Sequence, residues 1–195
     1  MYFEQYIEFR PYASMITLKA PNGEEIHIEI GPGSSFGAGH ITTKLCLKGI
    51  EEIFKRKKIK NVLDLGCGTG VLGISAKVLG AECVLAIDVD PLAVEEARMN
   101  ALRNGIESNF FSVCGSLEDI QGRFDLVIAN IVTDDLLRMS KGIKLLIDDG
   151  GLLLVSGISE LKKEKALKGF TEAGFSLDRE LMEESWVAMI LNDRQ

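Results

Sequence analysis

Apolar and polar residues alternate in two short runs near the start of the chain, "SMITLKA" at 14–20 and "IHIEI" at 26–30. Alternation with a period of two predicts strands that bury one face and expose the other. The segment between the runs contains Asn22-Gly23, a pair that supplies the positive φ of a tight turn. The pattern therefore predicts a short antiparallel β-hairpin.

A glycine-rich stretch, "GPGSSFGAGH" at 31–40, follows this hairpin and leads into a segment with helical periodicity. The apolar positions that define the periodicity are Cys46, Ile50, Ile53 and Phe54. Residues three and four apart share one face of a helix, so we expect an amphipathic helix over 41–58. Thr42 or Thr43 is the expected cap, because a hydroxyl there accepts a hydrogen bond from a free backbone N–H.

From residue 61 onward, short apolar runs alternate with helical segments. The runs predict strands at 61–65, 83–89, 109–114, 124–130 and 151–157, and the helical segments lie at 70–80, 91–104 and 134–150. This order is typical of a parallel sheet whose strands are joined by crossover helices. Asp90 is the expected cap of the second helix, with Pro91 at its first position and Gly105 after its end.

The end of the chain breaks this alternation. Two apolar runs, 174–182 and 185–193, are joined by a short acidic turn with no helix between them, which predicts a terminal hairpin. At least one strand therefore runs antiparallel to the others. The expected fold is α/β: a Rossmann-like, doubly wound, mostly parallel sheet of seven strands that ends in an antiparallel hairpin, preceded by the short N-terminal β-hairpin.

Length and composition favour a single globular domain. The chain has 195 residues, of which 46% are hydrophobic and 26% are charged, close to globular averages. The one candidate boundary lies in the glycine-rich stretch, and the residues before it are too few to fold alone. We therefore expect residues 1–39 to form a dependent extension and residues 40–195 to form the functional domain.

Charge and cysteine content narrow the function classes. The net charge of −7 leaves no general basic surface for a phosphate backbone, so nucleic acid is not the expected partner. The basic run "KRKKIK" at 55–60 is expected to complement the dipole of a helix end. The four cysteines are widely spaced, which favours reduced thiols in the cytoplasm and no metal site. No signal peptide is recognisable, and no run approaches the ~18 apolar residues of a membrane span.

The segment "DLGCGTGVLG" at 64–73 carries two overlapping glycine patterns. Read from Gly68, the spacing G-x-G-x-x-G matches a dinucleotide-binding turn. Read from Asp64, the spacing D-x-G-x-G-x-G matches a methyl-donor turn. In both cases the glycines let the backbone turn sharply after a buried strand and approach a ligand at a helix N-terminus.

The acidic residue favours one ligand over the other. Asp64 lies two residues before the first glycine, where it would repel a diphosphate but favour the sulfonium and ammonium groups of S-adenosylmethionine. Asp88 ends the following strand and can accept hydrogen bonds from both ribose hydroxyls, and Val89 offers adenine an apolar face. The sequence therefore predicts S-adenosyl-L-methionine as the cofactor, with a nicotinamide-dependent oxidoreductase as an alternative.

The chain resembles a known family in these residues and beyond them. "VLDLGCGTG", "AIDVDP" and the final hairpin are similar to class I S-adenosylmethionine-dependent methyltransferases over about residues 40–192. "FGAGHITTKLCL", "NGI", "ANI" and "GGLLLVSGI" resemble, in order and spacing, the methyltransferases that modify large-subunit ribosomal protein eleven. The resemblance implies an enzyme that transfers methyl groups.

The resemblance also implies which residues bind the cofactor. The segment 36–43 would close over its methionine end, with Thr43 in contact with it. Gly66 and Gly68 would contact it from the glycine turn, and Asp88 would bind its ribose.

Three further positions complete the implied site. Ser116 and Leu117, just past the third strand of the sheet, would flank the adenine. Asn130 ends the fourth strand, where it would contact the cofactor and orient the lone pair of an incoming amine toward the methyl group. No catalytic base is required, because the protein mainly aligns the reacting atoms and excludes water.

The sequence departs from that family in features that bear on the acceptor. The family's N-terminal domain, which grips the ribosomal protein, is expected to be absent; the "FGAGH" loop is one residue shorter; and "IVTDD" after Asn130 is more acidic than usual. Asp134 and Asp135 are expected to begin a helix, and His40 is expected to be incidental.

The expected acceptor is therefore an amine of a protein or a small molecule. The alternative is a non-catalytic cofactor-binding subunit whose partner chain, or a second copy of this chain, docks on the N-terminal hairpin.

Overall fold

The computed structural model describes residues 13–33 and 39–193. The strands are β1 (Ser14–Lys19), β2 (Glu25–Ile30), β3 (Asn61–Leu65), β4 (Cys83–Asp88), β5 (Phe110–Cys114), β6 (Phe124–Asn130), β7 (Ile147–Ser159), β8 (Phe175–Glu183) and β9 (Trp186–Asp193). The helices are α1 (Ile41–Arg56), α2 (Val71–Val78), α3 (Pro91–Arg103), α4 (Thr133–Leu146) and α5 (Lys163–Glu172), with 3₁₀ turns η1 (Leu117–Asp119) and η2 (Glu160–Lys162).

Seven strands form one mixed sheet in the order β5-β4-β3-β6-β7-β9-β8. The five strands from β5 to β7 are parallel, whereas β9 pairs antiparallel with both β7 and β8. The predicted fold class, including the terminal hairpin with an antiparallel strand, is confirmed. The carboxyl ends of β3, β4, β5 and β6 consequently meet at one edge of the sheet, where open α/β sheets bind ligands.

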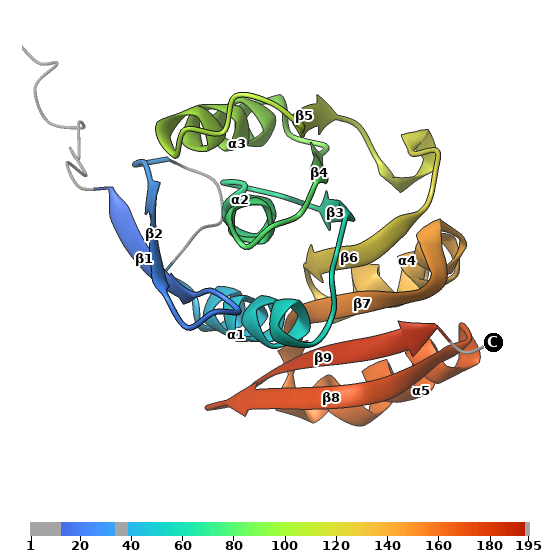
Figure 1. The fold of residues 1–195 in the computed structure, drawn as a ribbon. Coiled ribbons are helices and arrows are strands. Elements are labelled where there is room, and N and C mark those ends of the chain that lie inside the picture. The colour runs from blue at the N-terminus through green and yellow to red at the C-terminus, as the bar shows by residue number, and fades with distance from the viewer. Residues whose placement is uncertain (1–12, 34–38, 194–195) are drawn as a thin grey trace, which may run out of the picture.

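Helices cover both faces of this sheet (Figure 1). Along β3, Val62 packs with α1 and α2 on one face, and Leu63 packs with α4 on the other. Successive side chains of a strand point to opposite faces, so a strand covered on both sides must be apolar at both alternations. This explains why the central strands are nearly continuous hydrophobic runs.

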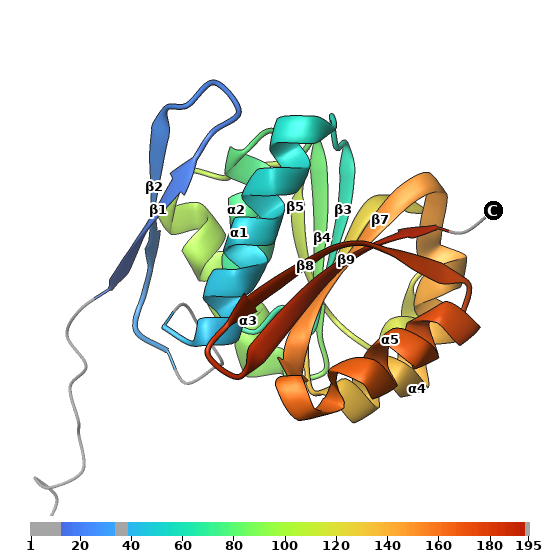
Figure 2. The ribbon, with the colours of Figure 1, turned by 90° about the horizontal axis from the view of Figure 1, so that it is seen from below.

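The two N-terminal strands form a separate antiparallel sheet that lies beside α1, away from the main sheet (Figure 2). Leu18, Ile28 and Ile30 are buried in the core shared with α1 and α2. The predicted hairpin is confirmed, with the positive φ of its turn supplied by Gly23 alone (89°).

The helix boundaries confirm one predicted cap and contradict another. Asp90 caps α3 by accepting a hydrogen bond from the Leu92 N–H at 2.9 Å. The predicted threonine cap of α1 is wrong: His40 is the N-cap residue, and Thr42 and Thr43 lie buried inside the helix. An imidazole nitrogen that accepts from the Thr42 N–H replaces the expected hydroxyl.

Two other boundaries differ from the prediction. Helix α4 ends at Leu146, and the following strand begins at Ile147 rather than at 151. Helix α5, which buries Ala166 and Phe170 against the sheet, was not predicted because only these two positions of its ten residues are buried. Within the described ranges, no helix combines the length and hydropathy that a membrane crossing requires.

Close packing at the start of α2 generates a stability prediction. Gly70 has a φ of 76°, and a Cβ there would lie 2.8 Å from the Cβ of Ala97 on α3. Gly105 has a similar φ of 71° but no atom within 4 Å of its Cβ position. Gly105→Ala should cost about 1 kcal/mol through backbone strain alone. Gly70→Ala should cost a further ~1–3 kcal/mol through overpacking. Equal losses in urea denaturation would show that the contact with Ala97 is not limiting.

Candidate functional site

The turn between β3 and α2 is held by backbone hydrogen bonds to the end of the neighbouring strand. Gly66, Gly68 and Gly70 all have positive φ, at 69°, 52° and 76°. The N–H groups of Gly66 and Cys67 donate to the Ile87 carbonyl at 2.9 and 3.0 Å. The glycines therefore let the backbone coil against β4 instead of continuing outward.

Asp88 links this turn to the start of α3. Its Oδ2 accepts from the Gly68 N–H at 3.0 Å, and its Oδ1 accepts from the Asp90 N–H at 3.0 Å. Each carboxylate oxygen has a second lone pair, so the group can still accept hydrogen bonds from a ligand. Val89 follows with 73% of its surface exposed, beside the carboxylate.

The end of β5 forms a capped turn. The Ser116 N–H and hydroxyl both donate to Asp119 Oδ2, at 2.8 and 3.0 Å, in a reciprocal capping arrangement. These two bonds, first the one from the backbone N–H and then the one from the hydroxyl, lower the pKa of the Asp119 carboxyl. Leu117 is buried directly behind this turn.

Asn130 at the end of β6 and Thr43 on α1 face each other across the edge of the sheet. The Asn130 Nδ2 donates to the Thr43 Oγ1 at 3.3 Å. The Asn130 Oδ1 is buried and has no hydrogen-bond partner among the residues that the structure describes. An unsatisfied buried carbonyl is costly, so this oxygen is suited to accept a donor from a ligand.

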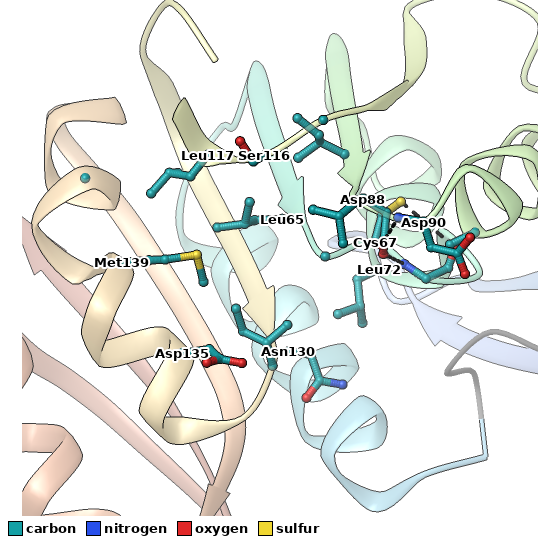
Figure 3. A pocket seen from close by; sticks show the side chains of 18 of the residues that line it. Leu65, Cys67, Leu72, Asp88, Asp90, Ser116, Leu117, Asn130, Asp135 and Met139 are labelled. Carbon is teal, nitrogen blue, oxygen red and sulfur yellow. Dashed lines mark hydrogen bonds between the residues drawn. The ribbon is translucent and has the colours of Figure 1, made fainter. Parts of the chain in front are cut away.

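These elements enclose a cavity of about 800 Å³ (Figure 3). Eight of the nine cofactor residues predicted from the sequence line it: Thr43, Gly66, Gly68, Asp88, Val89, Ser116, Leu117 and Asn130. Its volume lies within the range typical of small-molecule and cofactor sites. The structure thus brings together residues from four strand ends and from α1.

Asp64 is the exception, because it lies beneath the turn and does not line the cavity. Its side chain points toward α2, where Oδ2 accepts from the Gly73 N–H at 2.8 Å. The carboxyl is fully buried, which raises the pKa of Asp64 to about 7; the hydrogen bond from Gly73 opposes this shift, and the nearby charge of Asp88 adds to it. Asp64 is therefore not placed to make the expected contact with a cationic ligand in this cavity.

A second cavity of about 540 Å³ adjoins the first. The two share three lining residues: Asn130, Ile131 and Asp135. The second cavity is bordered by Trp186 and by His40, whose rings meet edge to face with centroids 5.5 Å apart. His40 is therefore part of the wall as well as the cap of α1.

The acidic pair after Asn130 begins α4, as predicted, and is largely neutralised. Asp134 bonds to Lys162 and Lys165 at 2.7 and 2.8 Å, and these lysines lower the pKa of the Asp134 carboxyl to about 2. Asp135 pairs with Arg138 on the same helix. The mouth of the second cavity therefore has mixed rather than acidic charge.

The contribution of α4 to the first cavity was not predicted from the sequence. Asp135, Arg138, Met139 and Gly142 all line it. Their spacing of three, four and seven residues places them on one helix face, a signal that was available in the sequence. Of the closing segment implied at 36–43, residues 36–38 lie outside the described residues, whereas residues 39–43 are described and include the start of α1.

Comparison with protein families places most of the chain in one of them. The family described as "Ribosomal protein L11 methyltransferase (PrmA)" matches residues 10–194. The curated relative of that name from Geobacter metallireducens is 37% identical over 172 residues, covering 88% of this chain and 56% of the relative. The Bacillus velezensis relative is 39% identical over 169 residues, covering 86% and 54%. The chain thus spans about half the length of these curated relatives.

Solved structures agree with this placement. The ribosomal protein L11 methylase from Lactobacillus delbrueckii subsp. bulgaricus superposes with a TM-score of 0.79 at 33% identity, covering 85% of this chain and 84% of that chain. The N-methyltransferase NodS from Bradyrhizobium japonicum, solved in complex with S-adenosyl-l-homocysteine, has a TM-score of 0.60 at 15% identity, covering 78% and 83%. NodS shares the fold alone.

The burial of Asp64 generates a pH-dependent stability prediction. Its raised pKa means that the folded chain holds a proton that the unfolded chain releases between about pH 4 and 7. The wild type therefore loses stability as the pH rises through this window, and the loss is complete above it. Asp64→Asn keeps an acceptor oxygen for the Gly73 N–H but cannot ionise.

Between pH 5 and pH 8 the wild type should therefore lose on the order of a few kcal/mol of unfolding free energy relative to Asp64→Asn. Urea denaturation at several pH values measures it. A difference that stays constant with pH would show that Asp64 does not titrate in this range.

Proposed function

The chain belongs to the ribosomal protein L11 methyltransferase family, and from this premise we propose that it transfers methyl groups from S-adenosyl-L-methionine to an amine of ribosomal protein L11. One observation carries the proposal: the two cavities meet at Asn130, whose buried carbonyl oxygen has no hydrogen-bond partner in the described part of the chain. A methyl donor in the first cavity and an amine in the second would meet at this point.

The proposed cofactor orientation follows the polar groups of the first cavity. The Asp88 carboxylate would accept from the ribose hydroxyls, and Val89, Ser116 and Leu117 would hold the adenine. Gly66, Gly68 and Thr43, which also line the cavity, would hold the methionine end.

The charge of the first cavity favours this cofactor over a dinucleotide. Asp88, Asp90, Glu118 and Asp135 line it, against one cation, Arg138. An acidic lining favours a ligand with sulfonium and ammonium groups and disfavours a diphosphate. The Asp64 carboxylate, which was expected to supply this preference, instead stabilises the turn from beneath.

Asn130 is the proposed catalytic residue. S-adenosyl-L-methionine supplies a methyl group on a sulfonium, which leaves as a neutral thioether. The Asn130 Oδ1 accepts one N–H of the incoming amine, so that the nitrogen lone pair points toward the first cavity. The bond from Nδ2 to Thr43 fixes the amide in this orientation. Trp186 and Ile131 enclose the acceptor and exclude water, and no side-chain base is needed when the amine arrives neutral.

Residues 40–195 form the proposed methyltransferase domain, with residues 1–39 as a dependent extension. In the decisive experiment, the purified chain is incubated with ribosomal protein L11 and isotopically labelled S-adenosyl-L-methionine. The mass of L11 is then measured by mass spectrometry. A gain of methyl mass on an L11 amine supports the proposal. Methylation of a different component of a cell extract would revise the acceptor, and binding of the cofactor without any turnover would indicate a cofactor-binding subunit.

Asp88 provides a test of the cofactor orientation. Asp88→Asn retains one acceptor oxygen and replaces the other with a donor, so the affinity for S-adenosylhomocysteine should fall by about ten- to a hundredfold in calorimetry. Asp125→Asn is the matched control: this carboxylate also accepts two backbone N–H bonds, from Lys60 and Asn61, but at the opposite edge of the sheet. Equal affinities of both variants would contradict the ribose contact.

Asn130 provides a test of catalysis. Asn130→Ala should reduce the turnover number roughly a hundredfold through loss of orientation, with a smaller effect on the affinity for S-adenosylhomocysteine. Asn130→Asp keeps an acceptor oxygen in place and should retain more activity than the alanine variant. If both variants turn over equally, the carbonyl oxygen does not orient the acceptor.

A further inference from the structure

Asn100 on α3 connects the N-terminal hairpin to the glycine turn, although neither cavity includes it. Its buried Oδ1 accepts from the Gly31 N–H, which follows β2, at 2.9 Å and from Arg103 at 2.8 Å. Its Nδ2 donates to the Thr69 carbonyl, inside the turn, at 2.9 Å. One amide group therefore bonds both to the hairpin's exit and to the back of the turn.

Both the hairpin exit and the glycine turn lie in close contact with residues of α3. A Cβ at Gly31 would lie 2.2 Å from the Arg103 guanidinium, and a Cβ at Gly70 would lie 2.8 Å from the Cβ of Ala97. The hairpin exit and the glycine turn are thus pressed against the same helix. A shift of either segment would change the geometry of the Asn100 amide.

The Thr69 carbonyl belongs to the peptide that joins Thr69 to Gly70, within the turn whose Gly68 N–H bonds to Asp88. On the side of β4, the turn is held by the bonds of Gly66 and Cys67 to the Ile87 carbonyl and by the bond of Gly68 to Asp88. The bond from Asn100 supplies a fixed point on the side away from the cavity.

We infer that Asn100 is a positioning residue, which holds the glycine turn in its cofactor-binding conformation and makes the N-terminal hairpin a brace for that turn. The inference rests on one part of the proposed function, namely that the first cavity binds the cofactor. The hairpin thereby contributes to cofactor affinity without lining the cavity. Asn104, one turn further along α3, holds the same hairpin but does not bond to the turn: it accepts from the Glu29 N–H and donates to the Glu29 carbonyl, both at 2.8 Å.

This pair permits a matched experiment. Asn100→Asp keeps the acceptor for Gly31 but places a carboxylate oxygen against the Thr69 carbonyl. Asn104→Asp makes the same chemical change at the end of this helix; it removes the bonds to the Glu29 carbonyl and to the Asn100 backbone carbonyl but leaves the bond between the Asn100 side chain and Thr69 in place. Binding of S-adenosylhomocysteine is measured by calorimetry, thermal unfolding by circular dichroism, and amide hydrogen exchange of residues 66–70 without ligand.

Asn100→Asp should weaken S-adenosylhomocysteine binding roughly tenfold or more and accelerate exchange in the turn. Asn104→Asp should change the affinity for S-adenosylhomocysteine and the exchange rate of the turn by less than about threefold each. Its melting temperature should fall by about as much as that of Asn100→Asp. Should Asn100→Asp not fold, Asn100→Ser and Asn104→Ser give the same comparison without added charge.

Equal effects of the two variants, or an unchanged exchange rate in the turn of the Asn100 variants, would overturn the inference. The proposed function fails differently: the wild type itself would then not bind S-adenosylhomocysteine, whereas the hydrogen-exchange comparison would still decide the role of Asn100.

Discussion

Two carboxylates fix the turn between β3 and α2, and the shape of the first cavity depends on them. Asp64 bonds to the Gly73 N–H from beneath, and Asp88 bonds to the Gly68 N–H from the adjacent strand end. Phosphate-binding turns need such N–H groups free at a helix N-terminus. Here two of them are already bonded to the side chains of Asp64 and Asp88. The same bonds that stabilise the turn therefore make it a poor site for a diphosphate, which resolves the overlap between the two glycine patterns in the sequence.

Much of the fold follows from local patterns in the sequence. The buried strands are continuous apolar runs, and residues with strong conformational preferences mark several boundaries, such as Asp90 and Pro91 at the start of α3. The errors arose where tertiary contacts outweigh these preferences. His40 caps α1 in place of a threonine because its ring also packs against Trp186, a residue far away in the sequence.

The candidate site was predictable to the extent that it lies at strand ends, because the ends of parallel strands meet at one edge of the sheet. Asp64 was misplaced because it lies one residue before the end of β3, on the face covered by α1 and α2. The alternation of strand side chains, applied from Val62, would have placed it there. The ion pairs of Asp134 with Lys162 and Lys165 join segments about thirty residues apart, and no local pattern predicts them.

The two cavities differ in how they select a ligand. The first is built from strand ends and turns, and its acidic lining suits one cationic cofactor. The second is bordered by residues from separate regions of the chain, including His40, Lys162 and Trp186. Under the proposed function, selectivity between acceptors then rests on Asn130. An acceptor without an N–H or O–H leaves its buried carbonyl unsatisfied at a cost of about 1–3 kcal/mol, and sites of this kind reject such analogues strongly. An amine that arrives neutral can attack without first losing a proton, whereas a hydroxyl needs a base to ionise. Because the proposed mechanism uses no side-chain base, it favours neutral amines as acceptors.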